Sequence, residues 1–302
     1  MPSVRAISSL RSHGKTLLRL GGTPTASVER FSGGEAWCEV INEPGGLLPY
    51  AKKHLGPLQF ADVEMQVSID AHPALFRWIR DAWFGNPDRD KVALDTPGGG
   101  ESSRSIELAR ARILAVTLPA LDRMSRDKRF LSLRIAPRGV RRTGSSSDGM
   151  ERQEREFLSH NFDLKIAGID CSGILAVDAF TVQTSIPEGK KKAVLIFPDI
   201  RVYVDAEKAD PFREWFEDFV IAGNNDDDKE RDGSLEYQDP MLGDPLAVLQ
   251  ILHLGIYRIA DEPPPPTGPR RVRVDLYCER MELTTSAETS AGDTQPLAPV
   301  KV

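Results

Sequence analysis

Apolar and polar residues alternate with two different periods along this chain, and the change of period predicts strands followed by helices. The run VEMQVSI at 63–69 alternates strictly, which predicts a half-buried strand. An Asp-Ala-His-Pro turn follows, and ALFRWIRDAWF at 74–84 then places apolar residues at i, i+3, i+4 and i+7. That spacing predicts an amphipathic helix. The same order returns later, because PDIRVYVDA at 198–206 predicts a strand and DPFREWFEDFV at 210–220 predicts a helix.

The block at 61–85 and the block at 198–222 align without a gap at an offset of 137 residues. Four positions are identical, namely Asp62/Asp199, Val67/Val204, Trp78/Trp215 and Asp81/Asp218. The flanks keep the same order, since LRLGG at 18–22 matches LKIAG at 164–168, and VERFS at 28–32 matches VDAFT at 177–181. Two unrelated segments can share a strand-then-helix pattern. The collinear flanks favour duplication of a whole domain instead, because loops drift in length while core elements keep their order.

These patterns predict a mainly β protein with flanking helices, of the α+β class. We expect two tandem antiparallel β-barrels or sandwiches, each with one amphipathic helix. The segment at 245–260 is apolar and fits either a strand or a buried helix. The predicted organisation is a flexible N-terminus at 1–15, domain one at 16–142, a linker at 143–158, domain two at 159–285 and a disordered tail at 286–302.

Charge is divided unevenly between the two halves. Residues 1–150 hold 22 Lys and Arg against 16 Asp and Glu, a net +6, and residues 151–302 hold 17 against 29, a net −12. Solvated surfaces that drifted apart would explain this difference. The alternative is association in which domain one of one subunit faces domain two of the next. Arg138, Arg141 and Arg142 are then candidate subunit-interface residues.

Composition adds little chemistry. Three distant cysteines give neither a disulfide framework nor a metal spacing, and they suggest a reducing compartment. A run of about 18 apolar residues is missing, so we expect no membrane insertion. The sequence offers no motif for catalysis, and we expect the protein not to be an enzyme. Trp78 and Trp215 stand at core spacing on the predicted helices, which indicates packing residues.

Two segments suggest ligands. Loop 228–239 resembles a calcium loop, with carboxylates at its first, third, fifth and twelfth positions and Gly233 at the sixth. The candidate ligands are Asp228, Glu230, Asp232 and Asp239, and a solvated acidic loop is the alternative; no other cofactor is expected. The eight basic residues between 123 and 142 suggest nucleic-acid binding, or else a basic rim that meets an acidic neighbour.

The order of elements resembles that of a known family. A strand pair with a glycine turn (FDLKIAGIDCSGILAVDAFTV) precedes a strand that leads into a Trp-bearing helix (PDIRVYVDAEKADPFREWFEDFV), and an alternating strand (RVRVDLYCERMEL) closes the unit. This order is similar to that of the tail-tube proteins of phages and phage-like contractile injection systems. The resemblance implies β-barrels with a flanking helix that form stacked hexameric rings around a channel. Two units in one chain look more like tail-hub proteins, in which three chains imitate six units.

From this resemblance we expect a structural, ring-forming protein that builds a tube or a tube hub. The implied partners are further copies of the chain in a trimer or hexamer, other tail, sheath or baseplate proteins, and DNA or protein cargo in the channel. Assembly would be cytoplasmic, and the product a virion or phage-like particle. The alternative is a duplicated β-barrel module that binds nucleic acid or regulates another protein.

Overall fold

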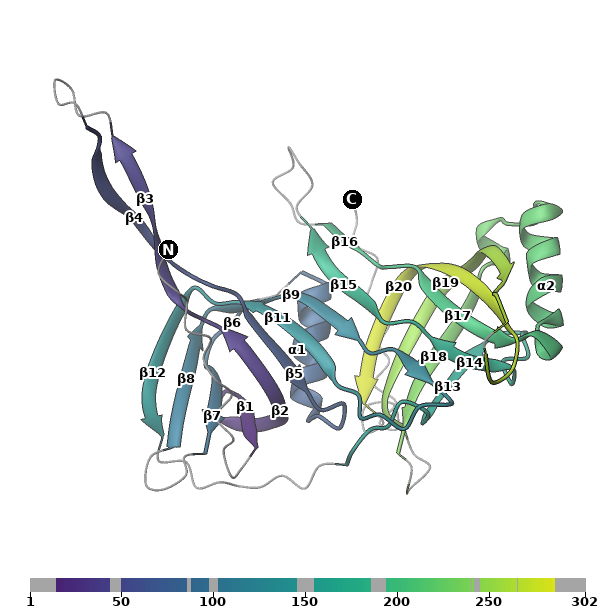
Figure 1. Cartoon of the computed structure of the whole chain (residues 1–302), viewed down its shortest axis with the longest axis horizontal. Coiled ribbons are helices and arrows are strands. Elements are labelled where there is room, and N and C mark those ends of the chain that lie inside the picture. Colours follow the sequence, from purple (N-terminus) through teal and green to yellow (C-terminus); the bar gives the residue numbers. More distant parts are fainter. Residues whose placement is uncertain are drawn as a thin grey trace.

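Over the residues that it describes, the computed structural model shows a mainly β protein with two α-helices, as the sequence predicts (Figure 1). It describes residues 15–43, 50–85, 88–97, 103–145, 155–185, 194–239, 241, 245–264 and 266–285. The strands of the first half are β1 (Thr16–Leu20), β2 (Thr23–Gly33), β3 (Ala36–Glu43), β4 (Lys52–Phe60), β5 (Val63–Val67), β6 (Asp88–Arg89), β7 (Val92–Thr96), β8 (Ser103–Ala109), β9 (Ala111–Leu118), β10 (Leu121–Asp122), β11 (Leu131–Ala136) and β12 (Gly139–Ser145). The strands of the second half are β13 (Phe162–Ile166), β14 (Ile174–Val177), β15 (Phe180–Ser185), β16 (Val194–Ile196), β17 (Ile200–Asp205), β18 (Arg231–Gln238), β19 (Pro245–Asp261) and β20 (Arg271–Thr285). The segment at 245–260 is therefore a strand.

The first sheet runs in the order β12-β8-β7-β1-β2-β5-β11-β9-β15-β16 and curls on itself. Strand β8 continues into β9 through Arg110, and β11 continues into β12 through residues 137 and 138. β8 and β9 are therefore one bent strand, and so are β11 and β12. Each bent strand pairs with other strands at both ends of the curled sheet. The result is a barrel whose inside is filled by alternate apolar residues such as Leu18, Met65 and Leu133.

The second sheet runs in the order β10-β14-β17-β20-β19-β18-β13. It repeats the pairings of the first sheet: β13–β18 corresponds to β1–β7, β14–β17 to β2–β5, and β17–β20 to β5–β11. The long β19–β20 ribbon corresponds to the bent β8–β9 and β11–β12 ribbon. These pairings are therefore built twice. The β1–β2 pairing that closes the first sheet has no counterpart between β13 and β14 among the described residues, so the second sheet stays open.

Irregularities repeat along with the pairings. One extra residue in β2 lies opposite β5 between Val28 and Arg30, and one extra residue in β14 lies opposite β17 between Ile174 and Ala176. A left-handed residue bends each long ribbon, at Arg110 (φ 47°) and at His253 (φ 56°). The bulge equates Val28 with Ile174, so the predicted match of 28–32 with 177–181 is displaced by three residues. The structural alignment therefore uses the same residue offset as the match of LRLGG with LKIAG.

Each unit carries one helix after its central strand. Helix α1 (Pro73–Trp83) begins at a proline, and the His72 imidazole accepts a hydrogen bond from the Ala74 N–H at 3.1 Å. Helix α2 (Asp210–Phe216) begins 137 residues later and continues into a π-helical turn, η2 (Glu217–Ile221). Figure 1 shows α1 between the two sheets and α2 on the far side of the second sheet.

The two sheets do not follow the predicted domain boundaries. Strand β10 of the first half joins the second sheet, and the β15–β16 hairpin of the second half extends the first sheet at β9. Part of the predicted linker is also packed, because Phe157 is buried and Arg155 contacts Asp70 and Asp239. Residues 146–154 of that linker lie outside the described residues, as do 1–14 of the predicted N-terminus and the whole predicted tail at 286–302.

A two-stranded ribbon, β3–β4, projects from the barrel (Figure 1). It leaves the sheet at Gly33 (φ 97°) and Gly34 (φ 74°). A β-carbon at Gly33 would lie 1.9 Å from the Asp62 carbonyl oxygen, so only glycine fits this exit. Almost every residue of the ribbon is exposed, which sets it apart from the rest of the fold.

Candidate functional site: a polar sheet face shared by both halves

A depression of about 550 Å³ opens on the outer face of the first sheet, over strands β2, β5, β11, β9 and β15. Residues that alternate with the barrel core line it, and most of them are polar. The polar lining residues are Arg30, Ser32, Glu64, Gln66, Thr117, Ser132, Arg134, Thr181 and Gln183. Both charge signs occur in this lining.

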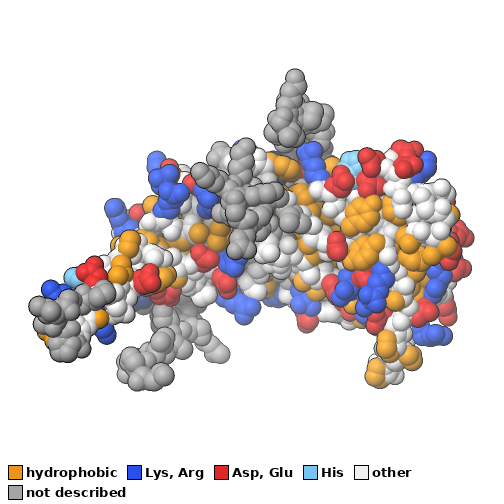
Figure 2. All heavy atoms as spheres, turned by 90° about the horizontal axis from the view of Figure 1, so that it is seen from above, with side chains coloured by type: hydrophobic (Ala, Val, Ile, Leu, Met, Phe, Trp, Pro, Cys, Tyr) orange, Lys and Arg blue, Asp and Glu red, His pale blue; other side chains and the backbone are white. Residues whose placement is uncertain are grey.

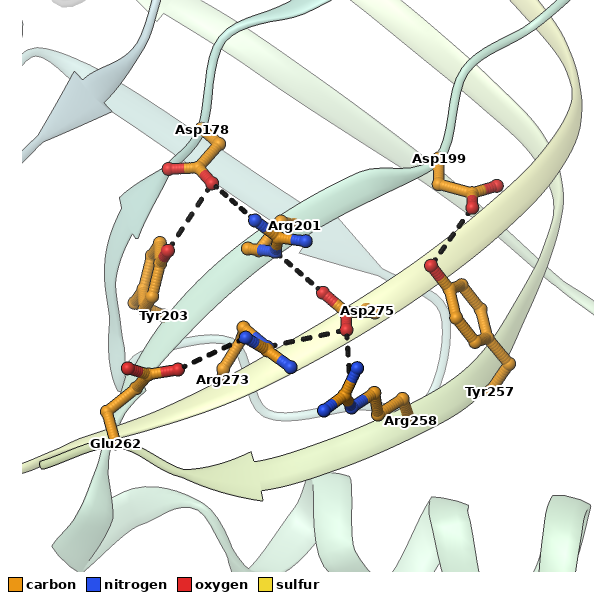
Figure 3. A network of polar contacts seen from close by, with 9 residues as sticks. All are labelled: Asp178, Asp199, Arg201, Tyr203, Tyr257, Arg258, Glu262, Arg273 and Asp275. Atoms are coloured by element: carbon orange, nitrogen blue, oxygen red, sulfur yellow. Dashed lines mark hydrogen bonds and ion pairs between the residues drawn. The ribbon is translucent and has the colours of Figure 1, made fainter.

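The equivalent face of the second sheet carries a network of ion pairs centred on Asp275 (Figure 3). Asp275 is 3% exposed. The Nε atom of Arg201 lies 2.8 Å from one of its carboxylate oxygens, and those of Arg273 and Arg258 lie 3.4 and 4.0 Å from the other. The hydrogen bond to Asp275 raises the pKa of Arg201 above its usual value. A buried carboxylate surrounded in this way by guanidinium groups is fixed in place.

Two tyrosines extend the network at its edges. The Tyr203 hydroxyl donates to Asp178 at 3.3 Å, and the Tyr257 hydroxyl donates to Asp199 at 2.9 Å. Burial, and then the neighbouring carboxylate, raises the pKa of each tyrosine, so both hydroxyls stay protonated donors. With Glu262, which contacts Arg273 at 3.5 Å, the network holds three guanidinium groups and four carboxylates, so its net charge is small.

The two faces correspond position by position. Glu64 on β5 stands where Arg201 stands on β17, and Arg134 on β11 stands where Asp275 stands on β20. Residues 178 and 179 join β14 in the second sheet to β15 in the first. We call the two faces together the polar face. In the second sheet its charges are paired within the protein.

The repeated residues of the sequence lie in two kinds of place. Trp78 on α1 and Trp215 on α2 are 0% and 3% exposed, so both are core residues. Asp62 and Asp199 lie at the start of β5 and β17, beside the polar face. Asp62 contacts the Nε of Arg134 at 4.0 Å, whereas Asp199 accepts from Tyr257.

The predicted calcium loop is wrong as a loop. Residues 231–238 form strand β18, so Asp228 and Asp239 lie at opposite ends of a strand about 25 Å long. Asp228 pairs with Lys229, and Asp239 is buried against Arg155 at 2.8 Å. The prediction of a loop failed because Leu235 and Tyr237 alternate with polar residues and are buried, as the inward-facing residues of a strand are.

Glu230 instead belongs to a cluster that the sequence did not reveal. Side-chain ligand atoms of Glu230, His253 and Glu279 all lie within 4.8 Å of one another and could hold a cation. His253 and the Tyr277 hydroxyl contact the Glu230 carboxylate at 3.0 and 2.8 Å. Burial, and then the hydrogen bond to Glu230, raises the pKa of Tyr277. The pairing of β18 with β19 and of β19 with β20 creates this cluster from residues 23 to 49 positions apart in the sequence.

The predicted basic residues are divided in the structure. Several of those between 123 and 134 make ion pairs, including Lys128 with Glu156 at 2.5 Å and Arg123 with Asp163 at 3.8 Å. Arg138 precedes β12, Arg141 and Arg142 lie on it, and all three are exposed. Arg142 donates to the Gly34 carbonyl oxygen at 3.4 Å.

No protein-family model matches the chain, and the search of curated proteins finds no match. Within the described residues, neither helix is long and apolar enough to cross a membrane.

Proposed function

We propose that the protein is a structural, ring-forming subunit of a phage tail or phage-like injection particle, in which it builds a tube or tube-hub channel. The observation that carries the proposal is the way the two units join. The hairpin β15–β16 of the second unit pairs with β9 of the first, so one sheet passes from unit to unit. Further units can be added to a wall of such units by the same kind of strand pairing.

The polar face supports the same function. It occurs on both units, and the charges of its Asp275 network are paired within the chain. A channel that passes a polymer needs a hydrated lining that does not hold its cargo, and internally paired charges meet that need. The proposal assigns the protein no reaction and no cofactor.

Nucleic-acid binding by the basic segment is less well supported. Ion pairs within the chain already engage Arg123, Lys128 and Arg134. Cations that are paired in this way release fewer counterions from a phosphate backbone, which weakens the main source of affinity.

Negative-stain electron microscopy of the purified protein, with sedimentation velocity, tests the proposal. We expect rings or stacked rings with a central opening, and a sedimentation coefficient far above that of a monomer. A monodisperse monomer at every concentration that binds duplex DNA with a steep salt dependence would favour the alternative.

A further inference from the structure

The contact between the two halves of one chain leaves matching surfaces open at the two ends of the molecule. Inside the chain, β9 and α1 of the first half contact β15 and β20 of the second half. The corresponding elements are β19 and α2 at one end and β3 and β12 at the other. Each of these four elements has an edge or a face to which the described structure assigns no partner strand or helix.

The strand edges show this most directly. In the chain, β15 pairs with β16 on one side and with β9 on the other. Its counterpart is β3. In the sequence, β3 lies between β2 and β5, just as β15 lies between β14 and β17. Strand β3 pairs only with β4 among the described residues, which leaves its outer edge open.

The edge that would receive β3 is also open. The counterpart of β9 is the last part of β19, from Arg258 to Asp261. This part pairs with β20 on one side, but on its other side the pairing with β18 ends at Leu254. An unpaired strand edge is a template for another strand.

The ribbon that carries β3 has apolar side chains and no core of its own. Cys38 with Leu58 and Val40 with Leu55 are cross-strand pairs on one face. Leu55 is 74% exposed, Leu58 61% and Val40 51%. A lone two-stranded ribbon is marginally stable in water, so this one needs a partner surface. Figure 2 shows hydrophobic side chains at the surface of this projection.

The helices also show a surface that is covered inside the chain and open in its counterpart. Helix α1 is buried on two faces, and helix α2 on one face. Leu75, Trp78 and Ala82 correspond to Phe212, Trp215 and Phe219, and all six are buried. The second face of α1 includes Trp83, which meets the Phe197 ring edge-to-face at 5.9 Å, and Phe84 follows it, beneath the Arg280 guanidinium at 5.1 Å. Their counterparts are Val220 and Ile221, which are 37% and 64% exposed.

Charges at the corresponding positions are complementary and reversed. Within the chain, α1 carries Arg77 and Arg80, and β20, which packs against α1, carries Glu282 on the same face as Arg280. At the open ends the signs change together, in two sets of exposed residues. Helix α2 with its π-helical turn carries Glu214 and Glu217, and β12 with its entry carries Arg138 and Arg141.

We infer that a second copy of this chain occupies these open surfaces. The β3 edge and the β12 face of one copy pack on the β19 edge and the α2 face of the next, in the geometry that joins the two halves. In the chain Gln183 pairs with Ala115, and the corresponding pair between copies is Trp37 with Arg258. The contact is head-to-tail, so it closes into a ring or continues as a helix. This inference rests on the proposed ring-forming function and names its interface.

Disulfide trapping tests the predicted register. In a Cys38→Ser background, Trp37→Cys is combined with Arg258→Cys, and the assembled protein is treated with a mild oxidant. We expect covalent multimers that disappear on reduction. The matched control is Gln59→Cys with Arg258→Cys, because Gln59 lies opposite Trp37 on the other strand of the ribbon and does not belong to the pairing edge. The control should give at least tenfold fewer multimers.

A second pair of variants tests the helix face. Val220→Asp with Ile221→Asp should abolish assembly and leave the circular dichroism spectrum of the protein unchanged, because both side chains are exposed. Met124→Asp is the control, since Met124 is 68% exposed and lies outside the proposed contact. It should assemble like the wild type.

The outcomes separate the two proposals. Rings in the electron microscope without trapping, or with normal assembly of the α2 variant, would overturn the interface and leave the proposed function standing. Trapped open chains without rings would support the interface and overturn ring formation. A protein that stays monomeric and untrapped at every concentration would overturn both.

Discussion

At Asp275 and Arg134 the two halves of the chain place opposite charges at the same position of the same strand. Asp275 gathers Arg201, Arg258 and Arg273, whereas Arg134 meets Asp62. The backbone position is kept while the sign changes. On the polar face the two units thus carry opposite charges at one position, each beside a group of opposite sign, whereas the core positions Trp78 and Trp215 are identical.

The tryptophans give a direct test of the core at this scale. Trp78→Ala and Trp215→Ala should each lower the free energy of unfolding by about 3–5 kcal/mol, because each removes a buried indole and leaves a cavity. Trp78→Ala should cost more, since α1 is buried on two faces. Urea denaturation followed by far-ultraviolet circular dichroism measures both values. Exposed Tyr50→Ala is the control, and a loss below about 1 kcal/mol at either tryptophan would contradict its place in the core.

Asp88 supplies a prediction for pH. The Nε of Arg112 lies 2.7 Å from its carboxylate, and this hydrogen bond lowers the pKa of Asp88 below its ordinary value. A lowered folded-state pKa means that the pair stabilises the fold above the unfolded-state pKa, and that this stability is lost as the pH falls through the folded-state pKa. Asp88→Asn should therefore lower the urea midpoint at neutral pH and match the wild type in strong acid.

The matched control for this pH dependence is Asp90→Asn. Asp90 is exposed, and no ion pair of it is recorded in the described structure. Its substitution should leave the midpoint unchanged at both pH values. If Asp88→Asn is as stable as the wild type at neutral pH, the Asp88–Arg112 pair contributes nothing measurable.

At the scale of elements, each unit bends one long ribbon at a residue with positive φ. Arg110 marks the break between β8 and β9, and His253 marks the same place in β19. For a residue other than glycine this conformation costs free energy, because the β-carbon crowds the following carbonyl oxygen. The bend is what allows one ribbon to pair at both ends of the curled first sheet.

Arg110→Gly should therefore raise the stability of the protein, by about 0.5–1 kcal/mol. Arg110→Ala is the control, because it removes the same guanidinium group and keeps the backbone strain. Thermal unfolding should show a higher midpoint for the glycine variant than for the alanine variant. Equal midpoints would mean that the bend stores no strain at Arg110.

Much of this architecture could be predicted from alternation and helical period. The strand at 63–67, the helix at 73–83 and their repeats follow from local spacing of apolar residues. The crossing of β15 into the first sheet could not, because the residues of β15 alternate as those of any strand do, and their partner β9 lies about 65 residues away. The Glu230–His253–Glu279 cluster escaped prediction for the same reason, since ribbon register decides which side chains meet.

At the scale of the whole molecule, the proposed contact gives the net charges of +6 and −12 a location. Arg138, Arg141 and Arg142 lie at one open end, and Glu214 and Glu217 at the other. Exposed ion pairs contribute little singly and are screened beyond about 8–10 Å at physiological salt. They should govern the rate and register of assembly, while strand pairing and apolar contacts hold the assembly together.

Charge reversal of Arg138, Arg141 and Arg142 to Glu should slow assembly without unfolding either half. Light scattering after a jump in protein concentration measures the rate, and added salt should slow the wild type more than it dissolves formed assemblies. Glu214→Arg with Glu217→Arg should restore part of the lost rate in the triple variant. Normal assembly of the triple variant, with the salt dependence of the wild type, would show that this basic stretch takes no part in the contact.

The crossing hairpin has a consequence for how the protein is made. Synthesis runs from the N-terminus, so β9 is exposed as an open, apolar edge until residues 180–196 have left the ribosome and β15–β16 can cover it. During that interval the nascent barrel presents to other nascent chains the same edge that the mature chain closes for itself. Neighbouring chains translated on one messenger RNA can thus exchange their β15–β16 hairpins. A slow stretch of translation before residue 180 would increase that exchange.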